Sequence, residues 1–451
     1  GLGVLFLNDN PQVPQAADFN DQRTQAEILA AWSEFVGDLD AAGVHEATHE
    51  EFEAWRTVDE VAPVELTADE LKLWRQSETV LRMGQIREAV QSNRRNHGMI
   101  LAALPPGEWH TGWVRDAIYA VVALSMTGHH EESRKAMDFF LSAEGSFFSG
   151  SNYLDQEYRV SACRYFGNGK EEGDFNNKGP NIETDGWGLV LWAARLYLHY
   201  SCDMAWLDSP TWRADKQQTS MEALQEIVED IDSDAKDGLT GPDASIWEVH
   251  WDLRKVFAYT VACQVRGLLD FADMARAKGM DEDAAAAEAL GDQFRDVGLE
   301  NLVYDSAQSI ASHIGVAGNA AHVDGSTVEW LSWDLIDPDS EVALGTLQNY
   351  SKLLTNFGGY QRLEDDLSLT GESKAGTYDT SEWILLDLRI GEAWRRTGDP
   401  DSIAWADALL DKVTEHALAN DHLVPELYDR DSGAYAGVVP MVSYGAGACM
   451  M

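Results

Sequence analysis

Between Leu66 and the C-terminus the sequence repeats one pattern, an amphipathic helix followed by a loop rich in Gly, Pro and Asp. Apolar residues recur at the helical period, and the alternation typical of strands is nearly absent. A capping box, with Thr67 as the N-cap and Glu70 three residues later, opens the first helix, which we expect to run toward Asn93. No expected helix is long enough for a coiled coil, so the pattern predicts an all-α bundle or a closed ring of helical hairpins.

The loops between the expected helices alternate in character. Long loops carry Trp, Gly, Asp, Glu, His and Tyr, whereas the loops between them are short, as at Thr127-Gly128-His129. In a ring of hairpins this alternation places the long loops on one face, where a binding pocket belongs. After the first helix, the others are expected over residues 115–126, 130–142, 185–202, 219–232, 255–278, 283–297, 326–336, 341–355, 379–397, 401–418 and 441–451.

Residues 1–65 do not share this pattern. They begin with a short apolar run and the turn Asn8-Asp9-Asn10-Pro11, after which short acidic helices are expected. Because 451 residues exceed the usual size of one compact domain, we expect an irregular linker or the remnant of a preceding domain over 1–65 and one helical unit over 66–451. Residue 1 is Gly rather than Met, so we expect a processed or trimmed product, and an exported location is favoured although no signal peptide opens this chain.

The charge of the chain limits its partners. Asp and Glu number 77 against 33 Lys and Arg, which gives a formal net charge of -44 at pH 7. Such an acidic surface repels nucleic acid and anionic membranes, and no apolar run reaches the roughly 18 residues of a membrane span. The acidic residues are spread along the chain, so most of them are interpreted as a solvated surface. A neutral substrate fits this charge best.

Motifs for cofactors and metals are missing from the sequence. It has no dinucleotide-binding, phosphate-binding, serine-hydrolase, zinc-protease or EF-hand motif. The adjacent pair His129-His130 is not helically spaced and indicates a hairpin turn. We therefore expect neither a metal nor an organic cofactor. Four cysteines lie far apart without metal-ligand spacing, and a disulfide among them stays open: Cys163, Cys202, Cys263 and Cys449.

A candidate catalytic acid ends the loop at 242–248, where Glu248 directly follows Trp247. An indole wall disfavours the charged form of a neighbouring carboxyl group, which raises its pKa and keeps a proton available for a leaving oxygen. The same indole can stack on a sugar ring. Taken alone, however, Glu248 is equally well explained as a surface residue that caps a helix.

Two further loops offer groups that suit a ligand with several hydroxyls. Arg115 and Asp116 follow a pair of tryptophans that includes Trp113, and together they supply donors and acceptors. In isolation Asp116 is explained by the favourable field at a helix N-terminus. Asp185 also enters an expected helix, where it is equally expected as the N-cap.

Glu426 supplies the partner for the candidate acid. It lies in a loop before the last expected helix, where an exposed charge is the simpler interpretation. In a ring of hairpins, however, Glu248 and Glu426 can face each other although they are far apart in sequence. Glycoside hydrolysis needs such a pair, one carboxyl group protonated and one ionised, and the paired carboxylate also favours the protonated acid.

The order of these segments resembles glycoside hydrolase family 15, the glucoamylase-like enzymes, in the bacterial and archaeal branch that includes glucodextranases. The joint match covers roughly residues 66–451 and is more specific than any one motif. It implies an (α/α)6 barrel, often preceded by a β-sandwich domain, and hydrolysis of an α-glucosidic bond with inversion at a non-reducing end. The matching segments are Trp-Val-Arg-Asp-Ala (113–117), Asn-x-x-x-Asp-Gly (181–186), Ser-Ile-Trp-Glu-Val (245–249) with Arg254, Val-Asp-Gly-Ser (323–326) and Pro-Glu (425–426).

The resemblance also implies roles for single residues. Glu248 matches the family's general acid and Glu426 its general base. Two positions depart from the family pattern, since Leu427 stands where glutamine usually follows Pro-Glu and Glu183 replaces an uncharged amide. Both departures leave the pair of glutamates intact and leave the substrate preference open. The residues implied to bind or surround the substrate are Trp113, Arg115, Asp116, Asp185, Trp247 and Arg254.

The sequence therefore predicts an inverting, exo-acting α-glucoside hydrolase that acts on a neutral oligo- or polysaccharide. Because an inverting pair leaves room for a water, the carboxyl groups of Glu248 and Glu426 should lie about 6.5 to 9.5 Å apart. Two alternatives stay open, a trehalase or other glucosidase on the same scaffold, and a catalytically silent sugar-binding barrel. The two intact glutamates count against the silent barrel.

Overall fold

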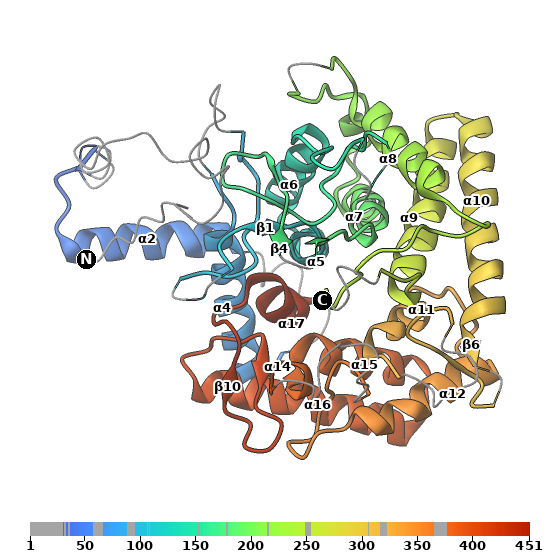
Figure 1. Cartoon of the computed structure of the whole chain (residues 1–451). Coiled ribbons are helices and arrows are strands. Elements are labelled where there is room, and N and C mark those ends of the chain that lie inside the picture. Colours follow the sequence, from blue (N-terminus) through green and yellow to red (C-terminus); the bar gives the residue numbers. More distant parts are fainter. Residues whose placement is uncertain are drawn as a thin grey trace.

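The structure is a computed structural model of the chain, drawn in Figure 1. Its described residues form mainly helices, and every strand among them is two residues long. Of the described helices, none is long and apolar enough to cross a membrane. The structure describes residues 30, 33–34, 37–56, 66–87, 95–105, 107, 109–150, 154, 156–176, 179–213, 216–248, 254–304, 306–315, 323–364 and 377–451.

Six inner elements form a closed ring. Each contacts the next along the chain, and the last of them returns to the first. Most residues of the inner helices α5, α7 and α9 are buried, which explains why these segments are apolar on most sides rather than on one stripe. The inner elements are α5 (Val114–Met126), α7 (Asp185–Ser201), α9 (Ala258–Ala277), α11 (Glu329–Ser332), α15 (Ile384–Arg396) and the π-helical η5 (Val442–Gly447), which α17 (Ala448–Met450) extends.

Five outer helices pack directly against an inner element, and the sixth, α12, packs against η3 (Gly325–Val328), which leads into α11. Figure 1 shows these helices arranged around the centre of the molecule, with α17 close to that centre. The predicted ring of helical hairpins is thus confirmed as an (α/α)6 barrel. The outer helices are α4 (Ala68–Gly84), α6 (His130–Ser142), α8 (Ser220–Asp234), α10 (Asp281–Leu302), α12 (Glu341–Asn349) and α16 (Pro400–Ala419).

The start of α4 agrees with the sequence, whereas its end does not. The backbone N–H of Thr67 donates to the Glu70 carboxylate at 2.7 Å and the Thr67 hydroxyl accepts from Glu70 N at 3.3 Å, so the capping box is confirmed. The helix ends at Gly84 rather than near Asn93, because Gln85 is extended and forms an isolated bridge with the chain near residue 100. Residues 88–94 lie outside the described part of the chain. The helices expected at 326–336 and 341–355 are also shorter, and each adjoins a 3-10 turn, η3 (Gly325–Val328) or η4 (Tyr350–Leu353).

Two glycines allow the inner helices α7 and α9 to touch. A Cβ at Gly188 would lie 2.1 Å from the carbonyl oxygen of Cys263, and one at Gly267 would lie 2.4 Å from the carbonyl oxygen of Gly188. Any larger residue would push the two backbones apart. These contacts fix the spacing of two neighbouring inner helices whose N-terminal ends carry loops of the site.

Short antiparallel strands tie the long loops to the N-terminal ends of two inner helices. In one sheet β1 (Gly112–Trp113), β2 (Arg164–Tyr165) and β3 (Glu171–Glu172) are neighbours, and Trp113 pairs with Arg164. In another, β9 (Leu427–Tyr428) lies between β8 (Glu382–Trp383) and β10 (Tyr435–Ala436), and Trp383 pairs with Leu427. These strands bring residues far apart in sequence to one end of the barrel.

The described part of the N-terminal segment contains α2 (Ala41–Trp55), which Figure 1 shows at the side of the barrel. Its last residue, Trp55, stacks on His129 with ring centroids 3.8 Å apart, so this end of α2 contacts the barrel. The domain boundary near residue 65 stays a prediction. All four cysteines are free thiols, so the structure contains no disulfide among them.

Candidate active site

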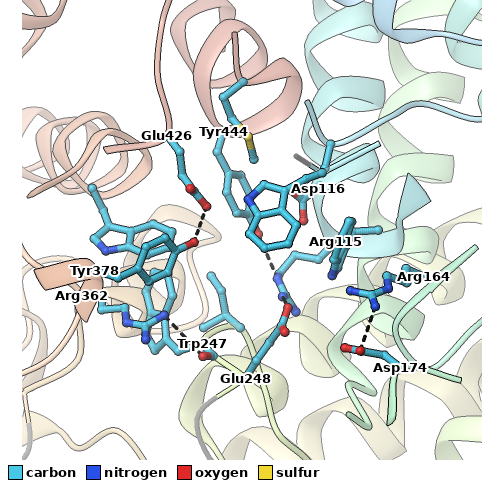
Figure 2. Close-up of a pocket in the computed structure, with 16 residues that line it drawn as sticks. Arg115, Asp116, Arg164, Asp174, Trp247, Glu248, Arg362, Tyr378, Glu426 and Tyr444 are labelled. Carbon is cyan, nitrogen blue, oxygen red and sulfur yellow. Dashed lines mark hydrogen bonds and ion pairs between the residues drawn. The ribbon is translucent and has the colours of Figure 1, made fainter. Parts of the chain in front are cut away.

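A cavity of 540 Å³ lies among the loops that precede the inner elements of the barrel. Figure 2 shows its lining side chains. Most of them come from the expected long loops, which span 104–114, 143–184, 233–254, 356–378 and 419–440, and Tyr444 comes from η5. Six of the eight site residues expected from the sequence line this cavity, whereas Asp185 and Arg254 do not. The lining residues are Ala102, Trp109, Trp113, Arg115, Asp116, Arg164, Asp174, Ile246, Trp247, Glu248, Arg362, Tyr378, Trp383, Glu426, Met441 and Tyr444.

Glu248 ends a tight turn with a strained backbone. Ser245 and Glu248 both have left-handed φ angles, 52° and 53°. Non-glycine residues in this conformation cost about 1–3 kcal/mol each and cluster at functional sites. The turn is held by the buried Asp243, because Thr260 Oγ1 donates to its carboxylate at 2.9 Å and lies 3.1 Å from Ser245 Oγ. Among the described residues the next helix, α9, begins only at Ala258, so Glu248 does not cap it.

Two opposing effects set the pKa of Glu248, namely burial and the neighbouring cation of Arg115. Arg115 Nη2 lies 3.5 Å from Glu248 Oε1, and 29% of the Glu248 side chain is exposed to the cavity. Burial raises the pKa of Glu248, the guanidinium of Arg115 opposes that rise, and the carboxylate of Asp174 adds to it. The expected rise of this pKa is therefore present, and the neighbouring carboxylate that adds to it is Asp174 rather than Glu426.

Trp247 is fixed as a wall of the cavity beside Glu248. Its Nε1 donates a 2.8 Å hydrogen bond to Oδ1 of Asp324, which also accepts from Ser326 N at 2.8 Å. The Trp247 and Trp383 rings meet edge to face with centroids 4.9 Å apart. The Val-Asp-Gly-Ser segment thus contributes by holding the indole rather than by entering the cavity.

Arg115 is the centre of a buried network behind the cavity. Its Nε donates to the Tyr444 hydroxyl at 2.9 Å and its Nη1 donates to Asp185 Oδ2 at 2.9 Å. Asp185 therefore contacts Arg115, which lines the cavity, but does not line the cavity itself. The expectation that Asp185 binds the substrate directly is corrected. It is also not the helix N-cap, because Thr184 occupies that position and Asp185 is the first residue of α7.

Glu183, one of the departures from the family pattern, belongs to the same network. It accepts hydrogen bonds from Arg115 Nη1, Asn181 Nδ2 and Cys163 Sγ, and it is almost fully buried. Burial raises its pKa well above the usual value although Arg115 opposes the rise. The additional carboxyl group therefore meets its partners inside the protein and does not line the cavity.

Asp116 and Trp113 both line the cavity. Asp116 lies in the first turn of α5, as its helix-terminus interpretation predicts, and it also lines the cavity. Ser443 Oγ donates to Asp116 Oδ1 at 3.3 Å, and burial raises the pKa of Asp116 to about 6. The guanidinium of Arg164 lies 4.3 Å from the Trp113 ring centroid, which fixes the indole from one side.

Glu426 directly precedes β9, and its side chain lines the cavity. It is buried, its backbone N–H donates to Val438 O at 2.9 Å, and its Oε1 accepts a 2.6 Å hydrogen bond from the Tyr378 hydroxyl. Burial raises the pKa of Glu426 to about 7, and the hydrogen bond from Tyr378 lowers it. Figure 2 shows Glu426 and Glu248 reaching the cavity from separate loops. The predicted distance between their carboxyl groups stays a prediction.

Arg362 lines the cavity together with Arg115 and Arg164, whereas the expected Arg254 does not. Arg254 follows Glu248 closely in sequence, but its side chain is absent from the lining. The Arg362 guanidinium lies 5.6 Å from the Trp247 ring centroid and 5.4 Å from those of Tyr378 and Trp383. It also donates to Trp247 O at 3.4 Å. The resemblance implied Arg254 as a substrate-binding residue, and the lining of this cavity does not include it.

Several other lining residues were not singled out from the sequence. Arg164 forms ion pairs with Glu172 and Asp174, the latter at 2.8 Å, and Asp174 reaches the cavity together with it. The loops that carry these residues were recognised as long and polar, but no motif marks the residues themselves. In the described part of the chain, no three His, Cys, Asp or Glu side chains are grouped so that they would hold a metal ion.

The sequence matches no protein-family model and no curated protein. The structure, in contrast, is similar to solved glycosidases. A glycosidase variant in complex with glucose matches with a TM-score of 0.62 at 19% identity, over 86% of this chain and 98% of that chain. At this identity the likeness establishes the fold.

Glucoamylases are also among the similar structures. A bacterial glucoamylase complexed with acarbose gives a TM-score of 0.67 at 15% identity, over 94% of this chain and 60% of that chain. A glycoside hydrolase family 15 glucoamylase from Hypocrea jecorina gives a TM-score of 0.59 at 15% identity, over 83% of this chain and 70% of that chain. The fold of this chain is therefore that of the glucoamylases, as the resemblance of the sequence implied.

Proposed function

We propose that this protein is an inverting, exo-acting α-glucoside hydrolase that releases glucose from the non-reducing end of an α-glucan or gluco-oligosaccharide. One observation carries the proposal. Two carboxyl groups with raised pKa values, Glu248 and Glu426, enter one cavity walled by tryptophans in a barrel with the glucoamylase fold. Pairs of this kind, an acid and a base, are what glycoside hydrolysis requires.

Glu248 acts as the general acid in this proposal. Burial favours its protonated form, so it holds a proton for the glycosidic oxygen as the bond to the anomeric carbon breaks. Trp247 beside it presents an aromatic face for the sugar, and its indole is held in place by Asp324. Arg115, 3.5 Å away, stabilises the carboxylate that remains after the proton has left.

Glu426 acts as the general base. With a pKa of about 7 it is ionised in a substantial fraction of molecules at neutral pH. It removes a proton from a water that attacks the anomeric carbon on the face opposite the leaving group, so the released glucose is the β-anomer. The hydrogen bond from Tyr378 to Oε1 orients the carboxylate.

The far end of the cavity suits a terminal sugar unit. Arg115 and Asp116 offer donors and an acceptor for its hydroxyl groups, and Trp113 offers an apolar face. Asp185 and Glu183, which lie behind Arg115, do not line the cavity. This arrangement supports a pocket that ends beyond one sugar rather than a cleft that runs through, and hence exo-action.

The replacement of each carboxyl group by its amide tests this function. Glu248→Gln and Glu426→Gln should each lower kcat by about 10²–10⁴ while calorimetry still detects glucose binding. Glu415→Gln, at an exposed position on α16, is the matched control and should keep full activity. Unchanged turnover in both site variants would overturn the enzyme proposal. Anomer-resolved NMR on maltose, isomaltose, dextran and trehalose then identifies the substrate, and α-glucose as first product would exclude inversion.

A further inference from the structure

An ion pair between Arg164 and Asp174 lines the cavity beside the proposed acid. Arg164 Nη2 lies 2.8 Å from Asp174 Oδ1. The two side chains are 14% and 12% exposed, whereas that of Arg115 is only 3% exposed. The Arg164–Asp174 pair is therefore more accessible to solvent than the arginine that is proposed to hold the terminal sugar.

The short sheet of β1, β2 and β3 holds Arg164 in place. Trp113, Arg164 and Glu172 are paired directly across its three strands, so their side chains share one face. The Arg164 guanidinium lies 4.3 Å from the Trp113 ring centroid, and its Nε and Nη2 donate to the Glu172 carboxylate at 2.6 and 3.0 Å. The same sheet thus positions the aromatic face proposed for the terminal sugar and the ion pair next to it.

The Arg164–Asp174 pair offers both a donor and an acceptor to a ligand. Arg164 uses Nε and Nη2 for its two carboxylate partners, and its Nη1 has no hydrogen-bond partner in the described part of the chain. Among the described residues, Asp174 Oδ2 accepts only a 3.3 Å hydrogen bond from Asn181 Nδ2. A guanidinium N–H beside a carboxylate oxygen suits two neighbouring hydroxyl groups of a sugar.

The Arg164–Asp174 pair lies on the side of the acid rather than on that of the base. Asp174 is close enough to Glu248 for its carboxylate to raise the pKa of the acid, whereas Glu426 is contacted by Tyr378. Figure 2 shows the pair to the right of Glu248 and the base to its left. In an inverting hydrolysis the leaving group departs on the side of the acid, opposite the attacking water. A leaving sugar would therefore meet this pair.

We propose that Arg164 and Asp174 bind the sugar unit on the leaving side of the scissile bond, and so make the enzyme prefer a sugar to a simple alcohol as leaving group. This inference rests on the proposed function, because Glu248 must protonate the oxygen between the two sugars. Arg164 Nη1 donates to one hydroxyl group of the leaving sugar, and the Asp174 carboxylate accepts from the next. The terminal sugar stays at Arg115 and Asp116.

Asp174→Ala tests the proposal with two substrates that release the same glucose. On the disaccharide that the wild type cleaves best among maltose, isomaltose and trehalose, kcat/KM should fall by about 10- to 100-fold, because the leaving sugar loses a hydrogen bond to a charged group. On methyl α-glucoside, whose leaving group is methanol, the loss should be smaller by about tenfold or more. Asp208→Ala, which removes an exposed aspartate paired with Lys278 at 2.7 Å, is the control and should change neither value.

A binding measurement gives a second readout without turnover. In the Glu248→Gln background, calorimetry should show that Asp174→Ala weakens binding of the same disaccharide by about tenfold and binding of glucose by less than about twofold. Retained glucose binding, together with circular dichroism and thermal melting, also shows that the variant folds. This readout does not depend on cleavage of methyl α-glucoside by the wild type.

The outcomes separate this inference from the proposed function. A wild type that cleaves none of these glucosides would overturn both. If the wild type is active, equal losses of Asp174→Ala on the disaccharide and on methyl α-glucoside would overturn the inference alone, because Asp174 would then act through Glu248. Unchanged activity on the disaccharide, or equal weakening of disaccharide and glucose binding, would also overturn it.

Discussion

The indole Nε1 of Trp247 and the Oδ1 of Asp324 are joined by a 2.8 Å hydrogen bond in the interior of the protein. The wall beside the proposed acid is therefore fixed by a residue on a different hairpin of the ring. Asp324 is itself immobilised, since the backbone N–H and the hydroxyl of Ser326 both donate to the same oxygen. The position of Trp247 against Glu248 thus depends on contact between two hairpins.

Asp324→Ala should weaken both folding and turnover. The variant leaves the buried Trp247 N–H without its acceptor, which costs about 1–3 kcal/mol, and frees the indole to move away from Glu248. We expect kcat/KM to fall by about tenfold or more, measured on the preferred gluco-oligosaccharide. Asp324→Asn keeps an oxygen acceptor and should retain most of the activity. Equal losses in the two variants would show that the hydrogen bond to Trp247 is not what matters.

Arg115→Lys tests whether the shape of the guanidinium is needed. A lysine keeps the positive charge, but one ammonium group does not reproduce donors spread toward Tyr444, Asp185 and Glu248 at once. We expect kcat/KM to fall by about 10²-fold and the melting temperature to fall as well, since buried carboxylates lose a partner. Arg134→Lys, whose side chain is 41% exposed, is the control and should change neither quantity. Full activity in Arg115→Lys would show that the shape of the guanidinium group is not needed.

Local signals in the sequence predicted the parts of the structure that local contacts determine. The capping box at Thr67 marks where α4 begins because both of its hydrogen bonds lie within four residues. The end of the same helix has no such signal. There Gln85 is extended and bridges to Ile100, and Gly84 packs so closely on Val442, near the other end of the chain, that a Cβ would lie 2.8 Å from it. Tertiary packing therefore determines the C-terminal end of α4 at Gly84, which the sequence pattern had placed near Asn93.

The same distinction applies to the site. Glu248 and Trp247 are adjacent in sequence, so their proximity could be predicted, and the ring of hairpins predicted that Glu426 would join them. Arg362 reaches Trp247 from more than a hundred positions away, and nothing in the sequence marks it. Arg254 was implied by the resemblance to the family, and its side chain does not line the cavity.

Lys412 is predicted to be essential for stability rather than for activity. Its Nζ lies 2.8 Å from Asp387 Oδ2 and also contacts Glu382, and both carboxyl groups are fully buried. Lys412→Met removes the only described cation that forms an ion pair with either carboxylate, so the free energy of unfolding should fall by about 3–5 kcal/mol in urea titrations. Lys352→Met, at an exposed position, should change it by less than about 0.5 kcal/mol.

The pH dependence of the Lys412 contribution follows from its pKa. Burial alone would lower that pKa, but Asp387 and Glu382 raise it above the usual value. A group whose pKa is raised in the folded state stabilises the fold below its unfolded pKa and loses that contribution as pH rises through the folded pKa. The difference between wild type and Lys412→Met should therefore be full at pH 7 and shrink only in strongly alkaline solution. A difference that already disappears near neutral pH would contradict the ion-pair explanation.

Tyr378→Phe should shift the acidic side of the pH profile of kcat/KM toward higher pH. The proposed base must be ionised, so kcat/KM falls as pH drops through the pKa of Glu426, which is about 7. The Tyr378 hydroxyl donates to Glu426 Oε1 at 2.6 Å and lowers that pKa, because it favours the ionised form. Without it the pKa rises, so kcat/KM measured from pH 5 to pH 9 should lose most at the acid end and least near pH 9. A uniform loss at every pH would instead indicate that Tyr378 only orients the carboxylate, and a limb displaced toward lower pH would contradict the assignment of Glu426 as the base.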